Sequence, residues 1–174
     1  MNAIAKYVSL VKFTHTIFAL PFALTAYVYA LVSTGTAFDW LLLGKILFCM
    51  VFARNTAMGF NRWADRRIDA ANPRTAGREI PSGQISPGAA LGFTIANAVG
   101  FLIMAGFINR LTLILAPVAL VVIMGYSYTK RFTAWSHLVL GLALAIAPSG
   151  AYFAVLGPLV WFHVLLSAPL PPPP

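Results

Sequence analysis

Three oxygen-bearing side chains stand four residues apart near the middle of the chain. At 3.6 residues per turn, Asn61, Asp65 and Asp69 spread over roughly 80° of one helical face. Carboxylate and amide oxygens are hard ligands that suit Mg²⁺, which usually completes its shell with water and with substrate phosphate oxygens. The pattern therefore predicts that these three residues bind Mg²⁺.

Basic side chains lie among these acids. The segment 61–86 holds three of the four acidic residues of the chain and five of its 12 Lys and Arg residues. Guanidinium groups are common bidentate partners of phosphate, so the two kinds of charge together favour a site for a metal ion and a diphosphate. The alternative is a solvated helix end whose Asp and Arg residues only pair with one another. Spacing alone leaves both interpretations open.

The same segment carries a longer pattern. Residues 61–83 read NRWADRRIDAANPRTAGREIPSG. This run resembles the first aspartate-rich motif, N-x-x-x-D-x-x-x-D, and the following loop of the UbiA superfamily of intramembrane aromatic prenyltransferases, above all the 4-hydroxybenzoate polyprenyltransferase branch. The resemblance implies that Asn61, Asp65 and Asp69 are catalytic and hold Mg²⁺ against the diphosphate of a polyprenyl donor. It also implies that Arg78 binds that diphosphate.

Two other stretches resemble the same family. Residues 125–131 read GYSYTKR, in which Tyr126 and Lys130 share a helical face. Tyr and Lys are also ordinary anchors at the end of a membrane helix, but the family has a Y-x-x-x-K motif there that contacts the prenyl diphosphate. Near the start, VKFTHTIFALPF resembles the opening segment of the family, which implies that Lys12 reaches the same diphosphate.

Composition predicts a membrane protein around these residues. The 174-residue chain is 60% hydrophobic and 9% charged, with a mean hydropathy of +0.82. We expect an all-α integral membrane protein that forms one domain over residues 1–174, packed in the lipid bilayer as a helical bundle. Apolar runs of sufficient length predict five transmembrane helices over 13–32, 40–60, 89–108, 111–128 and 137–156, with a short sixth segment at 158–170.

The basic residues predict the orientation. If the spans alternate, 10 of the 12 Lys and Arg residues fall on the side that holds the N-terminus and the charged loop 61–86. The positive-inside bias makes that side cytoplasmic, and we expect a bacterial inner membrane. The net charge of +8 does not indicate nucleic-acid binding, because the basic residues interrupt apolar spans and form no solvent-facing patch.

Arg54 is the least expected charge in an apolar span. It lies seven residues before Asn61 and about 20° off the same helical face. An ionisable residue inside a membrane span is a candidate for function, and we predict that Arg54 binds the carboxylate of an aromatic acceptor.

These features predict Mg²⁺-dependent transfer of a polyprenyl group from polyprenyl diphosphate to an aromatic acid in quinone biosynthesis. The acceptor is either 4-hydroxybenzoate or a naphthoate-type precursor. The alternative is a non-catalytic transporter or channel module, whose Arg54 and charged loop line an ion path.

Members of the resembled family have about nine helices and a second motif, D-x-x-x-D, in a later cytoplasmic loop. All four acidic residues here lie at or before Glu79. We therefore expect the chain to be truncated relative to the nine-helix fold, to correspond to its N-terminal part, and to have little or no activity alone.

Overall fold

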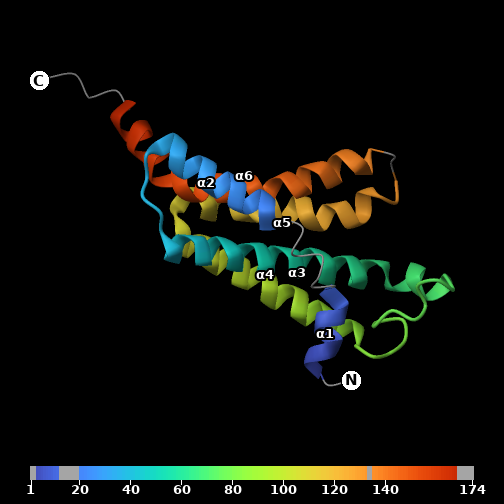
Figure 1. Ribbon diagram of the computed structural model, residues 1–174. Coiled ribbons are helices and arrows are strands. Elements are labelled where there is room, and N and C mark those ends of the chain that lie inside the picture. The colour runs from blue at the N-terminus through green and yellow to red at the C-terminus, as the bar shows by residue number, and fades with distance from the viewer. Residues whose placement is uncertain (1–2, 12–19, 133–134, 168–174) are drawn as a thin grey trace, which may run out of the picture.

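The computed structural model describes residues 3–11, 20–132 and 135–167, which form helices and turns without a strand (Figure 1). The expected all-α fold is confirmed. The helices are α1 (Ala3–Val11), α2 (Leu20–Thr34), α3 (Trp40–Ala71), α4 (Pro87–Ile108), α5 (Arg110–Thr129) and α6 (Ser136–Ser167).

Four of the described helices are long and apolar enough to cross a membrane: α3, α4, α5 and the first 22 residues of α6. The expected span 13–32 lies partly outside the described residues, and its described part belongs to the 15-residue helix α2. The expected sixth segment is not separate, because α6 continues without a break to Ser167. The prolines within α6 are compatible with this continuous helix, because a proline is tolerated in an apolar helix when neighbouring helices compensate for the lost backbone hydrogen bond.

Helix α3 extends from one apolar end of the bundle into the charged segment. Asp39 caps its start, since its Oδ1 accepts hydrogen bonds from the backbone N–H groups of Leu41 and Leu42 at 2.7 and 3.2 Å. The helix then runs for 32 residues to Ala71, so it continues beyond the membrane span expected over 40–60 and includes Asn61, Asp65 and Asp69 on one helix, as their spacing predicted. Charged and polar residues such as Arg and Ala-flanked Asp are compatible with a helix, and residues 61–71 are helical. Only residues 72–86 form a loop, named here loop 72–86.

Helices α3 and α4 lie side by side (Figure 1) and approach closely. Asn55 Nδ2 donates to Asn97 Oδ1 at 3.0 Å. One turn along α3, a Cβ atom on Gly59 would lie 2.5 Å from Thr94 Oγ1. A small residue and an interhelical polar contact are common where membrane helices pack, so this pairing fixes α4 along α3.

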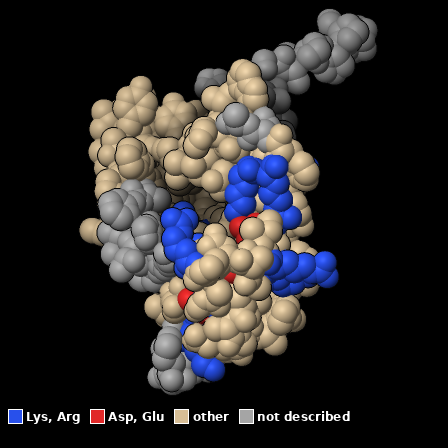
Figure 2. Space-filling view, turned by 90° about the vertical axis from the view of Figure 1, so that its right-hand side faces the viewer, with Lys and Arg blue, Asp and Glu red and all other residues tan. Residues whose placement is uncertain are grey.

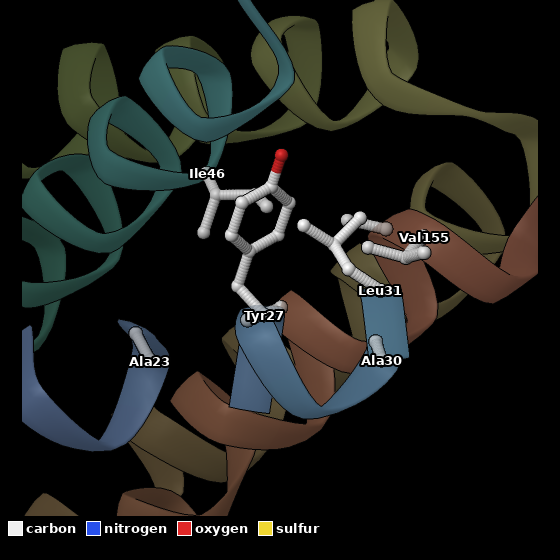
Figure 3. Packing of buried hydrophobic residues seen from close by; sticks show 8 residues of the cluster. Ala23, Tyr27, Ala30, Leu31, Ile46 and Val155 are labelled. Atoms are coloured by element: carbon white, nitrogen blue, oxygen red, sulfur yellow. The ribbon is translucent and has the colours of Figure 1, made fainter. Parts of the chain in front are cut away.

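The core cluster in Figure 3 joins α2 to α3 and α6. Tyr27 of α2 is fully buried and packs against Ile46 and Val155. Its hydroxyl donates to the backbone oxygen of Asp39 at 2.8 Å and accepts from the backbone N–H of Asp39 at 3.1 Å. A buried tyrosine needs such a partner for its polar end, and this contact attaches α2 to the start of α3.

Helix α1 lies at the opposite end of α3, beside loop 72–86. Leu10 is fully buried in a cluster with Ile80 and Ile85 of the loop. Ser9 Oγ donates to Glu79 Oε1 at 2.5 Å. An apolar cluster and a partly buried polar contact therefore hold the loop against α1.

Candidate functional site

Asp65 connects α3 to the end of α5. Lys130 Nζ donates to Asp65 Oδ2, and Arg131 Nη2 donates to Asp65 Oδ1 at 2.9 Å. Asp65 is only 6% exposed. The two cations offset the cost of burying this carboxylate. The structure thus brings together two residues of the predicted site, Asp65 and Lys130, that lie 65 positions apart in sequence.

Asp69 connects the end of α3 to loop 72–86. Arg78 Nη1 lies 2.7 Å from Asp69 Oδ1 and 2.8 Å from Oδ2. Thr75 Oγ1 donates to the backbone oxygen of Asp69 at 3.0 Å. Asp69 and Arg78, both predicted site residues, are therefore in direct contact. The pair uses one guanidinium nitrogen, and a guanidinium group has five N–H donors, so Arg78 retains donors for a phosphate.

Asn61 faces α5 one turn before Asp65. Its Nδ2 donates to Ser127 Oγ at 3.3 Å, and Ser127 is fully buried. Ser127 follows Tyr126 in sequence. The contact therefore aligns the aspartate-rich segment of α3 with the segment of α5 that carries Tyr126 and Lys130.

A cavity of about 620 Å³ lies between α3, α5 and α6, with further walls from α2 and α4. This volume is within the range of small-molecule pockets. Arg54, Asn61, Tyr126 and Lys130 line it, and most of its other lining side chains are apolar. On the face shown in Figure 2, Lys and Arg side chains border a hollow, with acidic side chains between them.

Arg54 lies deeper along α3 than Asn61, by seven residues or about 10 Å. It lines the cavity, and its Nε is buried without a hydrogen-bond partner among the described residues. A buried donor without a partner is costly. An anionic group in the cavity would supply the partner that Arg54 Nε lacks.

A second group of charges, which sequence reasoning did not assign to the site, lies on the loop side of α3. Arg62 is 5% exposed. Its guanidinium group interacts electrostatically with the charges of Arg78, Glu79, Asp69 and Asp65. Arg62 Nε and Glu79 Oε2 are both buried without a hydrogen-bond partner in the part of the chain that the structure describes. These residues extend the charged cluster from the cavity towards loop 72–86.

Arg131 was also missed, although it follows Lys130 directly in sequence. Two adjacent bases at the end of a membrane helix are usually interfacial anchors, so the only available signal was ambiguous. Lys12, the remaining predicted diphosphate ligand, lies outside the described residues.

The predicted metal ligands are one amide and two carboxylate side chains. Within the described residues, no group of three or more His, Cys, Asp or Glu side chains could hold a metal ion. Mg²⁺ often takes only one or two carboxylates and fills its shell with phosphate oxygens and water. Asp65 accepts two hydrogen bonds, whereas a carboxylate offers about four lone-pair sites. Asn61, Asp65 and Asp69 therefore fit the ion chemically, provided that a phosphate supplies further ligands.

Long apolar helices define an integral membrane protein, in which charged side chains lie at the border of a largely apolar cavity. The chain belongs to the UbiA prenyltransferase family, which matches residues 19–172.

Curated relatives carry two kinds of name. A 4-hydroxybenzoate octaprenyltransferase of Aliivibrio fischeri is 36% identical over 116 residues, which are 67% of this chain and 40% of the relative. A protoheme IX farnesyltransferase of Pseudoalteromonas atlantica is 36% identical over 138 residues, which are 76% of this chain and 44% of the relative. The chain thus spans less than half of the length of these relatives.

Solved structures share the fold. The apo structure of a UbiA homologue from Aeropyrum pernix is 34% identical and has a TM-score of 0.75, over 83% of this chain and 51% of that chain. A digeranylgeranylglyceryl phosphate synthase, at 22% identity, has a TM-score of 0.78 over 88% of this chain and 54% of that chain. The matched part of this chain therefore corresponds to about half of each of these two chains.

Proposed function

We propose that the chain is part of a Mg²⁺-dependent enzyme that transfers a polyprenyl group from polyprenyl diphosphate to an aromatic acid such as 4-hydroxybenzoate, in quinone biosynthesis. One observation carries this proposal. Asn61 of α3 and Tyr126 and Lys130 at the end of α5 line one largely apolar cavity, and Asp65 is hydrogen-bonded to that same Lys130. Charged groups and hydrophobic space are thus adjacent, as the two parts of a prenyl diphosphate require.

The donor diphosphate binds at the border of the cavity. Lys130 and Arg78 donate charged hydrogen bonds to its oxygens, Tyr126 donates from its hydroxyl, and we assign Lys12 the same role. Asn61, Asp65 and Asp69 would hold Mg²⁺ beside these oxygens. The ion, when bound, neutralises charge that develops on the leaving diphosphate.

The transfer breaks one bond and forms another. The allylic C–O bond of the donor breaks, and the diphosphate leaves with the electron pair. An aromatic ring carbon of the acceptor attacks the allylic carbon, and the ring then loses a proton, which the released diphosphate can accept. Lys130, Arg78 and Tyr126 stabilise the departing charge, while the apolar walls of the cavity exclude water that would otherwise capture the allylic cation.

Arg54 binds the carboxylate of the acceptor. Its position in the cavity, about 10 Å along α3 from Asn61, separates the acceptor carboxylate from the diphosphate. A guanidinium group suits a carboxylate because the two form parallel hydrogen bonds. A naphthoate-type acid would make the same contact, so Arg54 selects an aromatic carboxylate and not a particular ring.

The enzyme works at the inner membrane of a bacterium, with loop 72–86 on the cytoplasmic side. We also assign residues 1–174 to one transmembrane domain. Because all four acidic residues lie at or before Glu79, metal binding from this chain comes from one side of the site only. We therefore expect little or no turnover by residues 1–174 alone, which a prenyl-transfer assay with purified chain would test.

The binding step tests the function without requiring turnover. The purified chain in detergent should bind a farnesyl thiodiphosphate, whose C–S bond resists ionisation, at least ~10 times more tightly with Mg²⁺ than with EDTA. Asp65→Asn should remove most of this Mg²⁺ dependence. Asp39→Asn is the matched control, since Asp39 caps the far end of α3 through an oxygen that asparagine retains.

Equal binding in Mg²⁺ and EDTA would refute the metal–diphosphate site. A transporter or channel module would instead give ion flux into proteoliposomes that does not depend on Asp65. Membership of the UbiA prenyltransferase family favours the transferase.

A further inference from the structure

Asp65 is paired with two cations that follow one another in sequence. Both of its oxygens are engaged, Oδ2 by Lys130 and Oδ1 by Arg131. The Asp65 side chain is 9% exposed, whereas those of Lys130 and Arg131 are each 27% exposed. In the proposed function, Asp65 is a metal ligand and Lys130 a diphosphate ligand. The groups assigned to two different ligands therefore bind each other.

This pairing opposes the binding of either ligand alone, because each must displace or approach a group that is engaged with the opposite charge. A divalent cation that approaches Asp65 meets the positive charges of Lys130 and Arg131, and like charges a few ångströms apart repel strongly in a partly buried site. A diphosphate that approaches Lys130 competes with Asp65 for its ammonium group. Once the diphosphate has bound Lys130, however, Asp65 Oδ2 is available to the cation.

The two bases are placed differently around Asp65. Lys130 lines the cavity, and its Nζ lies 5.9 Å from the centre of the Tyr126 ring. Arg131 is not among the cavity-lining residues, and its Cζ lies 5.2 Å from the centre of the Tyr128 ring. Tyr128 packs edge-on against Phe60 of α3, with ring centres 5.7 Å apart. Lys130 can therefore turn to a ligand in the cavity, whereas Arg131 is held between Asp65 and an aromatic pair outside it.

We infer that Asp65, Lys130 and Arg131 form an ion-pair exchange unit that couples the binding of a divalent cation to that of a diphosphate. The diphosphate takes Lys130 from Asp65, and the released carboxylate oxygen accepts the cation. Arg131 is a positioning residue, which keeps the other oxygen of Asp65 and with it the end of α5 against α3. This inference rests on the proposed metal and diphosphate sites. Because binding free energies are linked, the coupling must act equally in both directions.

The test measures binding of Mn²⁺, as a spectroscopic substitute for Mg²⁺, to the full 174-residue chain in detergent micelles by electron paramagnetic resonance. Removing one competing cation should expose the carboxylate. Lys130→Gln should bind Mn²⁺ alone at least ~10 times more tightly than the unmodified chain. Inorganic pyrophosphate should tighten Mn²⁺ binding to the unmodified chain and lose most of this effect in Lys130→Gln.

Arg131→Gln supplies a second, distinct variant. It should also bind Mn²⁺ alone more tightly, but it should retain the pyrophosphate effect because Lys130 remains. Arg67→Gln is the charge-matched control, since Arg67 lies on the same helix two positions from Asp65 and is exposed. It should change Mn²⁺ affinity less than twofold if direct pairing, and not net charge, is responsible.

The outcomes separate the two proposals. Similar Mn²⁺ affinities in Lys130→Gln, Arg131→Gln and Arg67→Gln would overturn the exchange and leave the proposed function standing. Mn²⁺ binding that persists unchanged in Asp65→Asn, or fails in every form with and without pyrophosphate, would overturn the metal role of Asp65 and the exchange together.

Discussion

Replacing Arg78 with glutamine should release loop 72–86 from the end of α3. Asp69 is 5% exposed, and Arg78 Nη1 contacts both of its oxygens. Removing one member of a fully buried ion pair costs about 3–5 kcal/mol, but the Arg78 side chain is 34% exposed, so solvent screens part of the interaction. A cost of about 2 kcal/mol is therefore reasonable, and it corresponds to a roughly 30-fold rise in the open population of the loop.

Hydrogen exchange of the loop amides measures this population directly, since local opening governs exchange there. The backbone N–H of Ile85 donates to the backbone oxygen of Glu79 at 2.9 Å. This N–H should exchange roughly 30 times faster in Arg78→Gln than in the unmodified chain. Arg74→Gln is the matched control, because Arg74 is an exposed arginine of the same loop. Equal acceleration in both variants, or none in Arg78→Gln, would refute the view that the Asp69–Arg78 pair closes the loop.

Two further substitutions test the packing that supports the site. Gly59→Ala should lower the midpoint of thermal unfolding in detergent, because the new Cβ would meet Thr94 Oγ1 and separate α3 from α4 at a cost of about 1–3 kcal/mol. Gly44→Ala on the same helix is the control, since its Cβ would meet no atom within 4 Å, and it should leave the midpoint unchanged. An equal shift for both glycines would contradict the close approach. Tyr27→Phe should destabilise the protein by about 1 kcal/mol, since the Tyr27 hydroxyl makes two hydrogen bonds with the backbone of Asp39. An unchanged midpoint of thermal unfolding would show that these two hydrogen bonds make no net contribution to stability.

Much of the fold was predictable because its signals are local. The predicted spans 89–108 and 111–128 became α4, Pro87–Ile108, and α5, Arg110–Thr129. Ser86 caps α4 just before a proline, and Asn109 caps α5. The continuation of α6 to Ser167 was missed because a proline such as Pro158 usually interrupts a helix, whereas neighbouring membrane helices can compensate for the lost hydrogen bond.

The site was predictable only in part. Motif spacing selected Asn61, Asp65 and Lys130, which lie close together in the structure; their role in one metal–diphosphate site stays a prediction. Spacing carries no information about pairs between helices, however, so the second cation on Asp65 was not expected. The contact between Ser9 and Glu79 was likewise inaccessible, because it depends on how α1 packs on a loop 70 residues away in sequence.

The length of α3 determines how deep in the bilayer the reaction would take place. Asn61 lies about 31 Å along the helix from Trp40, close to the ~30 Å thickness of the hydrocarbon layer. In the proposed enzyme, the turns that follow would reach the headgroup region, where a phosphate stays hydrated while an isoprenoid tail stays dissolved in lipid. A donor of this kind can diffuse sideways within one leaflet and keep each of its two parts in the medium that solvates it. Such an enzyme requires no aqueous entry route for its largest substrate.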